Sequence, residues 1–203
     1  MGSEMCIRDR SSQYDCALTS FEKAVNNATD IDHKVSYLHN LGFAQSATHD
    51  FEGAVNTYQS LLENSVGVEE DRATVFNLSV ALMHSDQITE AREKLNWLYE
   101  KKSGADYRAA AQYYLGFSWI LEDSNSFESA IHHFRNAICI DRDIATLVYG
   151  ANNNIKIDGQ PFYFDLSVDE IKKHRQTACL SNFIAELHRG QTCWEHTDPI
   201  DCT

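Results

Sequence analysis

One motif recurs four times along the chain, and its spacing constrains the fold more than any other feature. Each copy has an alanine, then an aromatic residue or leucine four positions later, then an alanine or leucine three positions after that. Successive copies begin 37, 37 and 39 residues apart. Steps of four and three place the three side chains on one face of an α-helix. The four copies are Ala17/Phe21/Ala24, Ala54/Tyr58/Leu61, Ala91/Leu95/Leu98 and Ala130/Phe134/Ala137.

A second helical segment precedes each of the last three copies. These segments, 36–47, 74–85 and 111–122, each contain a leucine followed by glycine or serine: Leu41-Gly42, Leu78-Ser79 and Leu115-Gly116. Glycine inside a helix costs roughly 0.5–1 kcal/mol relative to alanine, so its position indicates a neighbouring helix that approaches closely. With second helices expected over 14–28, 51–65, 88–102 and 127–141, the repeated unit is a helical hairpin, and the first copy contains its second helix alone.

These positions resemble the tetratricopeptide repeat family, whose signature is Leu-Gly in the first helix and Ala, Phe and Ala in the second. The resemblance covers about residues 11–142 and gives a half repeat at 11–30 and full repeats at 35–68, 72–105 and 109–144. It implies an all-α fold in which the hairpins stack into a right-handed α-solenoid.

The first ten residues, MGSEMCIRDR, lie outside the repeat and resemble the translation of a sequencing adapter. They are left out of the fold prediction, and the natural chain is expected to begin further upstream. The half repeat then has an apolar stripe with nothing to cover one side, which predicts exposed apolar surface and self-association through it. The stripe consists of Tyr14, Leu18, Phe21 and Val25.

Residues 145–203 follow a different pattern. The alternating segment NIKIDGQPFYFDL predicts a β-hairpin that turns at Asp158-Gly159. Ser167 to Glu170 reads as a capping box that opens a helix, and Gly190 ends that helix. One hairpin and one helix are too little to fold alone. This tail is therefore expected either to cap the last repeat or to begin a truncated second domain.

Charge and composition exclude some classes of function. The net charge of −13 disfavours nucleic acid as a partner, because an acidic chain repels phosphate groups. No apolar run reaches the length of a membrane span. Five cysteines outside the first ten residues, odd in number and irregularly spaced, favour a reducing compartment over a disulfide framework.

The resemblance also implies a concave groove, lined by the first helices, that binds protein or peptide partners. The members of the family that hold a C-terminal carboxylate use Lys, Arg and Asn there; only Asn77 matches, so that role is disfavoured. The lining is mostly apolar and suits an apolar segment with buried anchors. Substituting both Phe76 and Tyr113 by alanine should then abolish binding, unless these residues pack between repeats or against the tail. The expected groove residues are His39, Phe43, Phe76, Asn77, Val80, His84, Tyr113 and Phe117.

No catalytic, metal or cofactor site is predicted. His188, Cys193, His196 and Cys202 do not match a compact zinc-site spacing, and the triplet His196-Thr197-Asp198 lacks a second histidine downstream. Nucleophile and phosphate-loop motifs are missing from the sequence. The expected function is a non-enzymatic protein-interaction or scaffold module. The alternative is a docking part of a larger, truncated enzyme.

Overall fold

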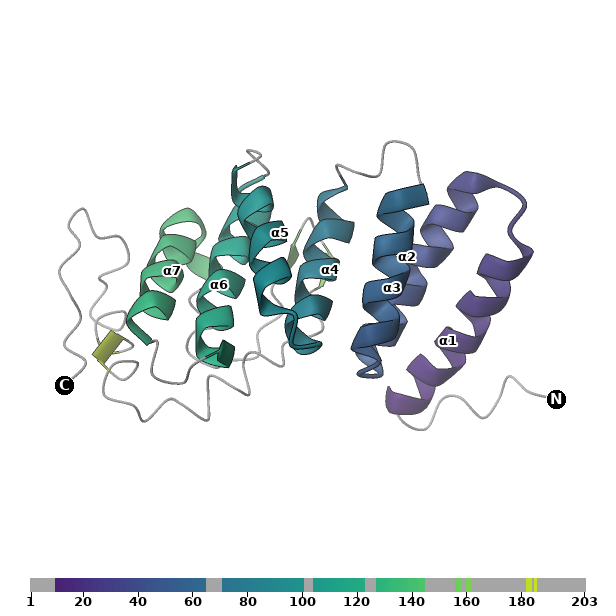
Figure 1. Ribbon diagram of the computed structural model, residues 1–203, viewed down its shortest axis with the longest axis horizontal. Coiled ribbons are helices and arrows are strands. Elements are labelled where there is room, and N and C mark those ends of the chain that lie inside the picture. Colours follow the sequence, from purple (N-terminus) through teal and green to yellow (C-terminus); the bar gives the residue numbers. More distant parts are fainter. Residues whose placement is uncertain are drawn as a thin grey trace. The chain divides into compact units, whose positions relative to one another are not determined.

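The computed structural model describes residues 10–64, 71–100, 104–122, 127–144, 156–157, 160–161, 182–183 and 185. Within these residues the chain is almost entirely helical, with seven α-helices that follow one another along the sequence (Figure 1). The prediction of an all-α fold is confirmed for this part of the chain. None of the described helices is long and apolar enough to cross a membrane.

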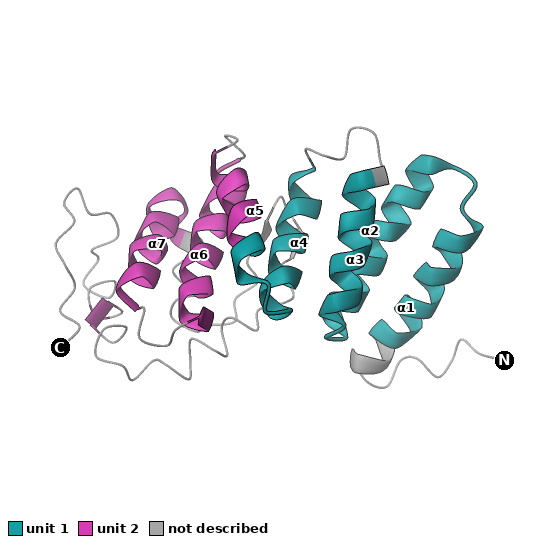
Figure 2. Cartoon of the chain, in the orientation of Figure 1, with its two compact units in different colours: residues 1–91 teal, residues 92–203 magenta. Residues whose placement is uncertain are grey.

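The chain forms two compact units, residues 1–91 and 92–203 (Figure 2). Unit 1 contains α1 (Arg10–Asn27), α2 (Ile31–Ala47), α3 (Phe51–Asn64), α4 (Arg72–His84) and the first residues of α5 (Ile88–Glu100). Each of α1, α2 and α3 packs against the helix that follows it. Unit 2 contains the rest of α5, α6 (Ala105–Glu122), α7 (Phe127–Ile140) and the 3-10 helix η1 (Arg142–Ile144), and α6 packs against α7.

The helices observed are those that the repeat predicts, with differences at their ends. Helices α2 and α6 begin at Ile31 and Ala105, earlier than the expected residues 36 and 111. For α2 the reason is Asp30, whose Oδ1 accepts the backbone N–H groups of Asp32 at 2.9 Å and His33 at 3.1 Å. This cap satisfies the free donors of a polar first turn, which a search for apolar periodicity misses.

The repeated stripe of each second helix is its packing face. In α3, α5 and α7 all three stripe residues are fully buried, at 0 % exposure. In α1 the corresponding residues Ala17, Phe21 and Ala24 are only half-buried. The stripe expected to be uncovered on one side, Tyr14, Leu18, Phe21 and Val25, is likewise half-buried, and its exposure stays a prediction. Cys16 of α1 is disulfide-bonded, contrary to the expectation of reduced thiols.

The two glycines in first helices lie where neighbouring helices touch. A Cβ atom added to Gly42 would lie 2.7 Å from Cζ of Tyr58 in α3. At Gly116 it would lie 2.7 Å from the backbone oxygen of Ala130 and 2.8 Å from ring atoms of Phe134, both in α7. The small residues therefore permit close helix approach, as the sequence predicts.

The turns after α2 and α4 have the same geometry although their sequences differ. The N–H of Asp50 donates to the carbonyl of Gln45 at 2.9 Å, and that of Gln87 to the carbonyl of Leu82 at 2.9 Å. One residue in each turn, His49 after α2 and Asp86 after α4, adopts a left-handed backbone conformation, with φ of 63° and 62°. This is the Schellman arrangement, in which glycine is the favoured residue at the left-handed position.

Replacing Asp86 with glycine is therefore expected to stabilise the protein by about 0.5–1 kcal/mol, because glycine adopts this conformation without a Cβ penalty. Chemical denaturation of the variant and the parent measures the difference. The matched control is Glu93→Gly, in the exposed interior of α5, which should destabilise by about 0.5 kcal/mol. Destabilisation by both substitutions would contradict the proposed strain at Asp86.

Two parts of the tail fall within the described residues. Strands β1 (Lys156–Ile157) and β2 (Gln160–Pro161) pair antiparallel, with Ile157 opposite Gln160. Strand β1 lies beside α6. Phe183 is fully buried, and the guanidinium carbon of Arg135 in α7 lies 5.9 Å from its ring centre. The rest of the predicted hairpin and helix lies outside the described residues, so the alternatives for the tail stay open.

Candidate functional site

The eight expected groove residues are divided between the two units. Helix α2 carries His39 and Phe43, and α4 carries the next four. Tyr113 and Phe117 lie on α6 in unit 2. Within unit 1, α2 and α4 are near neighbours, so the structure brings their first-helix residues onto one surface.

Four of the eight residues are buried in the structure. Phe76 is 2 % exposed, Val80 6 %, Tyr113 0 % and Phe117 1 %. The ring of Tyr113 lies 5.4 Å from that of Phe134, centre to centre. Truncating a buried aromatic residue to alanine costs about 3–5 kcal/mol. The double substitution of Phe76 and Tyr113 is thus expected to lower stability and cannot serve as a clean test of binding.

The other four residues are half-buried and form the remaining candidate site, here called the α2–α4 face. They keep part of their side-chain surface in contact with solvent, as a residue that contacts a ligand must. Phe43 is the large apolar member, and the other three are polar. The members of the α2–α4 face are His39, Phe43, Asn77 and His84.

A polar contact links the two helices at this face. Nδ2 of Asn77 lies 3.4 Å from Nε2 of His39. The Tyr58 ring meets the His39 ring edge-on at 5.9 Å between centres. Burial lowers the pKa of His39, against the opposing attraction of Asp71. His39 is therefore neutral near pH 7, and in the arrangement where Nε2 accepts from Asn77 its proton lies on Nδ1.

Tyr58 supports this contact from the core. Its side chain is fully buried beneath Gly42. Burial raises the pKa of Tyr58, and a hydrogen bond with Asn77 partly opposes the rise. The hydroxyl therefore stays protonated, and its hydrogen bond holds the Asn77 amide in place. Tyr58 was predicted as a stripe residue, but the sequence did not indicate this second role.

His84 sits at the other end of α4 and stacks on Phe51 of α3. Their ring centres are 4.7 Å apart, with an angle of 28° between the planes. Burial, with a smaller contribution from the nearby His49, lowers the pKa of His84 to about 4. Near pH 7 the α2–α4 face is therefore uncharged, although the chain as a whole carries a net charge of −13.

A second polar cluster, missed by the sequence analysis, joins α5 to α6 in unit 2. Arg92 Nε donates to Ser118 Oγ at 2.8 Å, and its Nη1 lies 2.8 Å from Oε2 of Glu122. The guanidinium carbon lies 3.9 Å from the centre of the Trp119 ring. This combination of an ion pair with a cation–π contact ties the two helices together, and we assign it a packing role.

The same unit contains a buried polar contact between α6 and α7. Gln112 is 4 % exposed, and its Oε1 lies 2.9 Å from Nδ1 of His133. Burial lowers the pKa of His133 to about 4, with smaller contributions from the nearby His132 and Arg92. His133 is therefore neutral near pH 7 and donates from Nδ1. A lone glutamine within the apolar run AAAQYYLGF was the available sequence signal.

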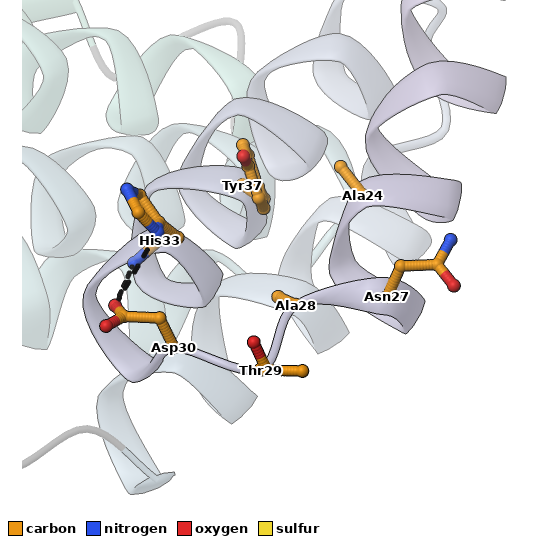
Figure 3. Close-up of a pocket in the computed structure, with 7 residues that line it drawn as sticks. All are labelled: Ala24, Asn27, Ala28, Thr29, Asp30, His33 and Tyr37. Atoms are coloured by element: carbon orange, nitrogen blue, oxygen red, sulfur yellow. Dashed lines mark hydrogen bonds and ion pairs between the residues drawn. The ribbon is translucent and has the colours of Figure 1, made fainter.

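The junction of α1 and α2 contains an open cleft of about 260 Å³ (Figure 3). The exposed side chains of Asp30 and His33 meet at its rim, with 3.7 Å between Oδ1 and Nδ1. The His33 ring stacks with Tyr37 at 6.3 Å between centres. The cleft is lined by Ala24, Asn27, Ala28, Thr29, Asp30, His33 and Tyr37. None of these was among the expected site residues.

Among the described residues, no group of three or more His, Cys, Asp or Glu side chains is placed to hold a metal ion. His188, Cys193, His196, Asp198 and Cys202 lie outside the described residues. Their ligand pattern therefore remains a sequence hypothesis.

Comparison with known proteins gives no assignment. No family model, no curated protein and no solved structure matches the chain significantly.

Proposed function

We propose that the chain is a tetratricopeptide-like α-solenoid that acts as a protein-interaction module, binding an apolar peptide or protein segment on the α2–α4 face. The observation that carries the proposal is the contact between His39 and Asn77, because it joins the first helices α2 and α4, and Phe43 lies four residues from His39 on α2 and is half-buried. The repeated Leu-Gly and Ala-aromatic-Ala positions support the solenoid.

The chemistry of the face favours an apolar ligand with an exposed peptide backbone. Its two histidines are neutral near pH 7, because burial lowers the pKa of both. A neutral surface gives no strong attraction to a charged side chain. Phe43 offers apolar contact area, whereas the Asn77 amide and the His39 ring can exchange hydrogen bonds with peptide groups.

A small number of buried side chains of the ligand would supply most of the binding energy. An apolar side chain of the ligand would pack against Phe43 and displace water from it, which supplies most of the affinity. The His39–Asn77 contact is held from below by Tyr58, so these donors and acceptors are already oriented before a ligand arrives. Preorganised groups lose less conformational entropy on binding.

Phe43→Ala is expected to weaken binding of a selected peptide by about tenfold or more, the effect of losing an aromatic anchor. A library of random peptides displayed on phage, panned against the full chain, supplies the ligand, and fluorescence polarisation measures Kd. The matched control is Tyr37→Ala, which removes a half-buried aromatic residue from α2 within the α1–α2 cleft. Equal affinity of the Phe43→Ala variant and the parent would refute the proposal.

A further inference from the structure

The face of α1 that carries Tyr14, Ala17, Phe21 and Ala24 is an apolar feature of unit 1 that the proposed function does not use. The steps of three, four and three between these residues are those of the a and d positions of a heptad. All four side chains are half-buried. The corresponding stripes of α3 and α7 are fully buried beneath α2 and α6.

We propose that α1 of this chain pairs with α1 of a second copy, as an antiparallel two-helix contact through this face. In an antiparallel pair each a residue lies opposite a d residue of the other helix. Here both a positions are aromatic and both d positions are alanine. The face is therefore complementary to itself, as a two-fold interface requires.

The complementarity fixes one register. Phe21 lies opposite Ala17 of the second copy, and Tyr14 lies opposite Ala24, so the two-fold axis passes at the level of Thr19. In each layer, an aromatic side chain of one copy then packs against an alanine of the other copy. The chain already uses this pairing within itself, where Gly42 lies over Tyr58 and Gly116 over Phe134. Large-to-small layers fill space without voids or overlap.

The cleft between α1 and α2 supports the same register. Ala24 belongs both to the face and to the cleft lining (Figure 3). The register brings Tyr14 of the second copy to the mouth of this cleft, whose volume of about 260 Å³ accommodates a phenol ring. Asn27 and Asp30 at the rim offer acceptors for its hydroxyl group, and a docked tyrosine usually requires such a partner.

The test is sedimentation equilibrium of the full chain over a range of concentrations. We expect a monomer–dimer equilibrium, and Phe21→Ala should raise the dissociation constant by about tenfold or more. Thr19→Ala, on the exposed opposite face of α1, is the matched control and should leave the constant unchanged. Circular dichroism verifies that each variant stays helical.

The decisive variant exchanges the two residues of one layer. Ala17→Phe combined with Phe21→Ala restores one aromatic residue opposite one alanine in the same register, so dimerisation should recover relative to Phe21→Ala alone. A helical exchanged variant that stays as weak as Phe21→Ala would overturn the register. The interface itself would be overturned if the parent chain remained monomeric, or if Phe21→Ala left the dimer dissociation constant unchanged.

The dimer contact and the peptide-binding face can be tested independently of each other. The pairing uses α1, whereas peptide binding is assigned to α2 and α4. Variants of Phe21 should therefore leave the peptide Kd unchanged, and Phe43→Ala should leave the dimer unchanged. Loss of dimerisation on adding the peptide would instead show that an apolar segment occupies the α1 face, and would contradict the assignment to a second copy.

Discussion

Gly116→Ala is expected to destabilise unit 2 by about 2 kcal/mol, within the range for an overpacked core. The sign is informative, because the same change in an exposed helix interior stabilises by about 0.5–1 kcal/mol. The added Cβ would lie 2.7 Å from the backbone oxygen of Ala130 and 2.8 Å from the Phe134 ring. A backbone oxygen in a neighbouring helix cannot rotate away, so α6 and α7 would have to separate.

Gly42→Ala provides a graded comparison, because its Cβ would meet only the ring of Tyr58, at 2.7–3.0 Å. A ring can shift more easily than a backbone, and the expected loss is about 1 kcal/mol. Gly104→Ser is the matched control, since nothing lies within 4 Å of its added Cβ and serine is a favourable residue before a helix. Urea denaturation followed by far-ultraviolet circular dichroism ranks the three variants. Stabilisation by Gly116→Ala would contradict the close approach of α6 and α7.

Acid is expected to destabilise the protein through His84 and His133. Burial lowers the folded-state pKa of each to about 4, against 6.5 for an ordinary histidine. Between these values the unfolded chain binds more protons than the folded chain. The stability that each neutral histidine contributes is therefore fully present above about pH 6.5 and is lost as the pH falls toward 4. The loss is at most on the order of 3 kcal/mol for each residue.

His133→Gln removes one of these titrations and keeps an N–H donor for Gln112. Its free energy of unfolding, measured with urea from pH 7.5 to pH 4, should fall less steeply than that of the parent. His132→Gln, which removes an exposed histidine from the same helix, is the matched control and should keep the steeper fall. Parallel curves for the parent and His133→Gln would show that His133 is not held neutral in the folded state.

The repeat predicted the helices and their contacts well because both depend on residues at fixed spacings. Gly42 and Gly116 were identified from their position after leucine, and each lies against an aromatic ring of the next helix. The start of α2 was missed because it depends on one capping carboxylate, that of Asp30, and on no apolar period. The left-handed residues His49 and Asp86 were missed because neither is glycine.

Spacing alone did not indicate which of the expected groove residues would be buried, and the reason lies in the helices that carry them. Spacing assigns a residue to a helix face but does not show what covers that face. In α2, 4 of 17 residues are buried, whereas 9 of 13 in α4 and 12 of 18 in α6 are buried. Phe76 and Tyr113 belong to helices that are apolar on nearly every side. Phe43 lies on a helix with many polar residues, and it is only half-buried.

The polar contacts could not be read from the sequence at all. His39 meets Asn77 across 38 residues, and Arg92 meets Ser118 across 26. Such contacts depend on the relative rotation of neighbouring helices, which a few tenths of an ångström of packing determine. The uncharged state of the α2–α4 face follows from those contacts and from burial, and the net charge of the chain gives no indication of it.

Chemical-shift mapping of the ¹⁵N-labelled chain during titration with a selected peptide tests directly where the peptide binds. We expect the largest shifts on the α2–α4 face, at Phe43, His39 and Asn77, with the α1 face unaffected. Shifts confined to α1, or spread evenly over buried residues such as Phe76 without effects at Phe43, would contradict the proposed binding face.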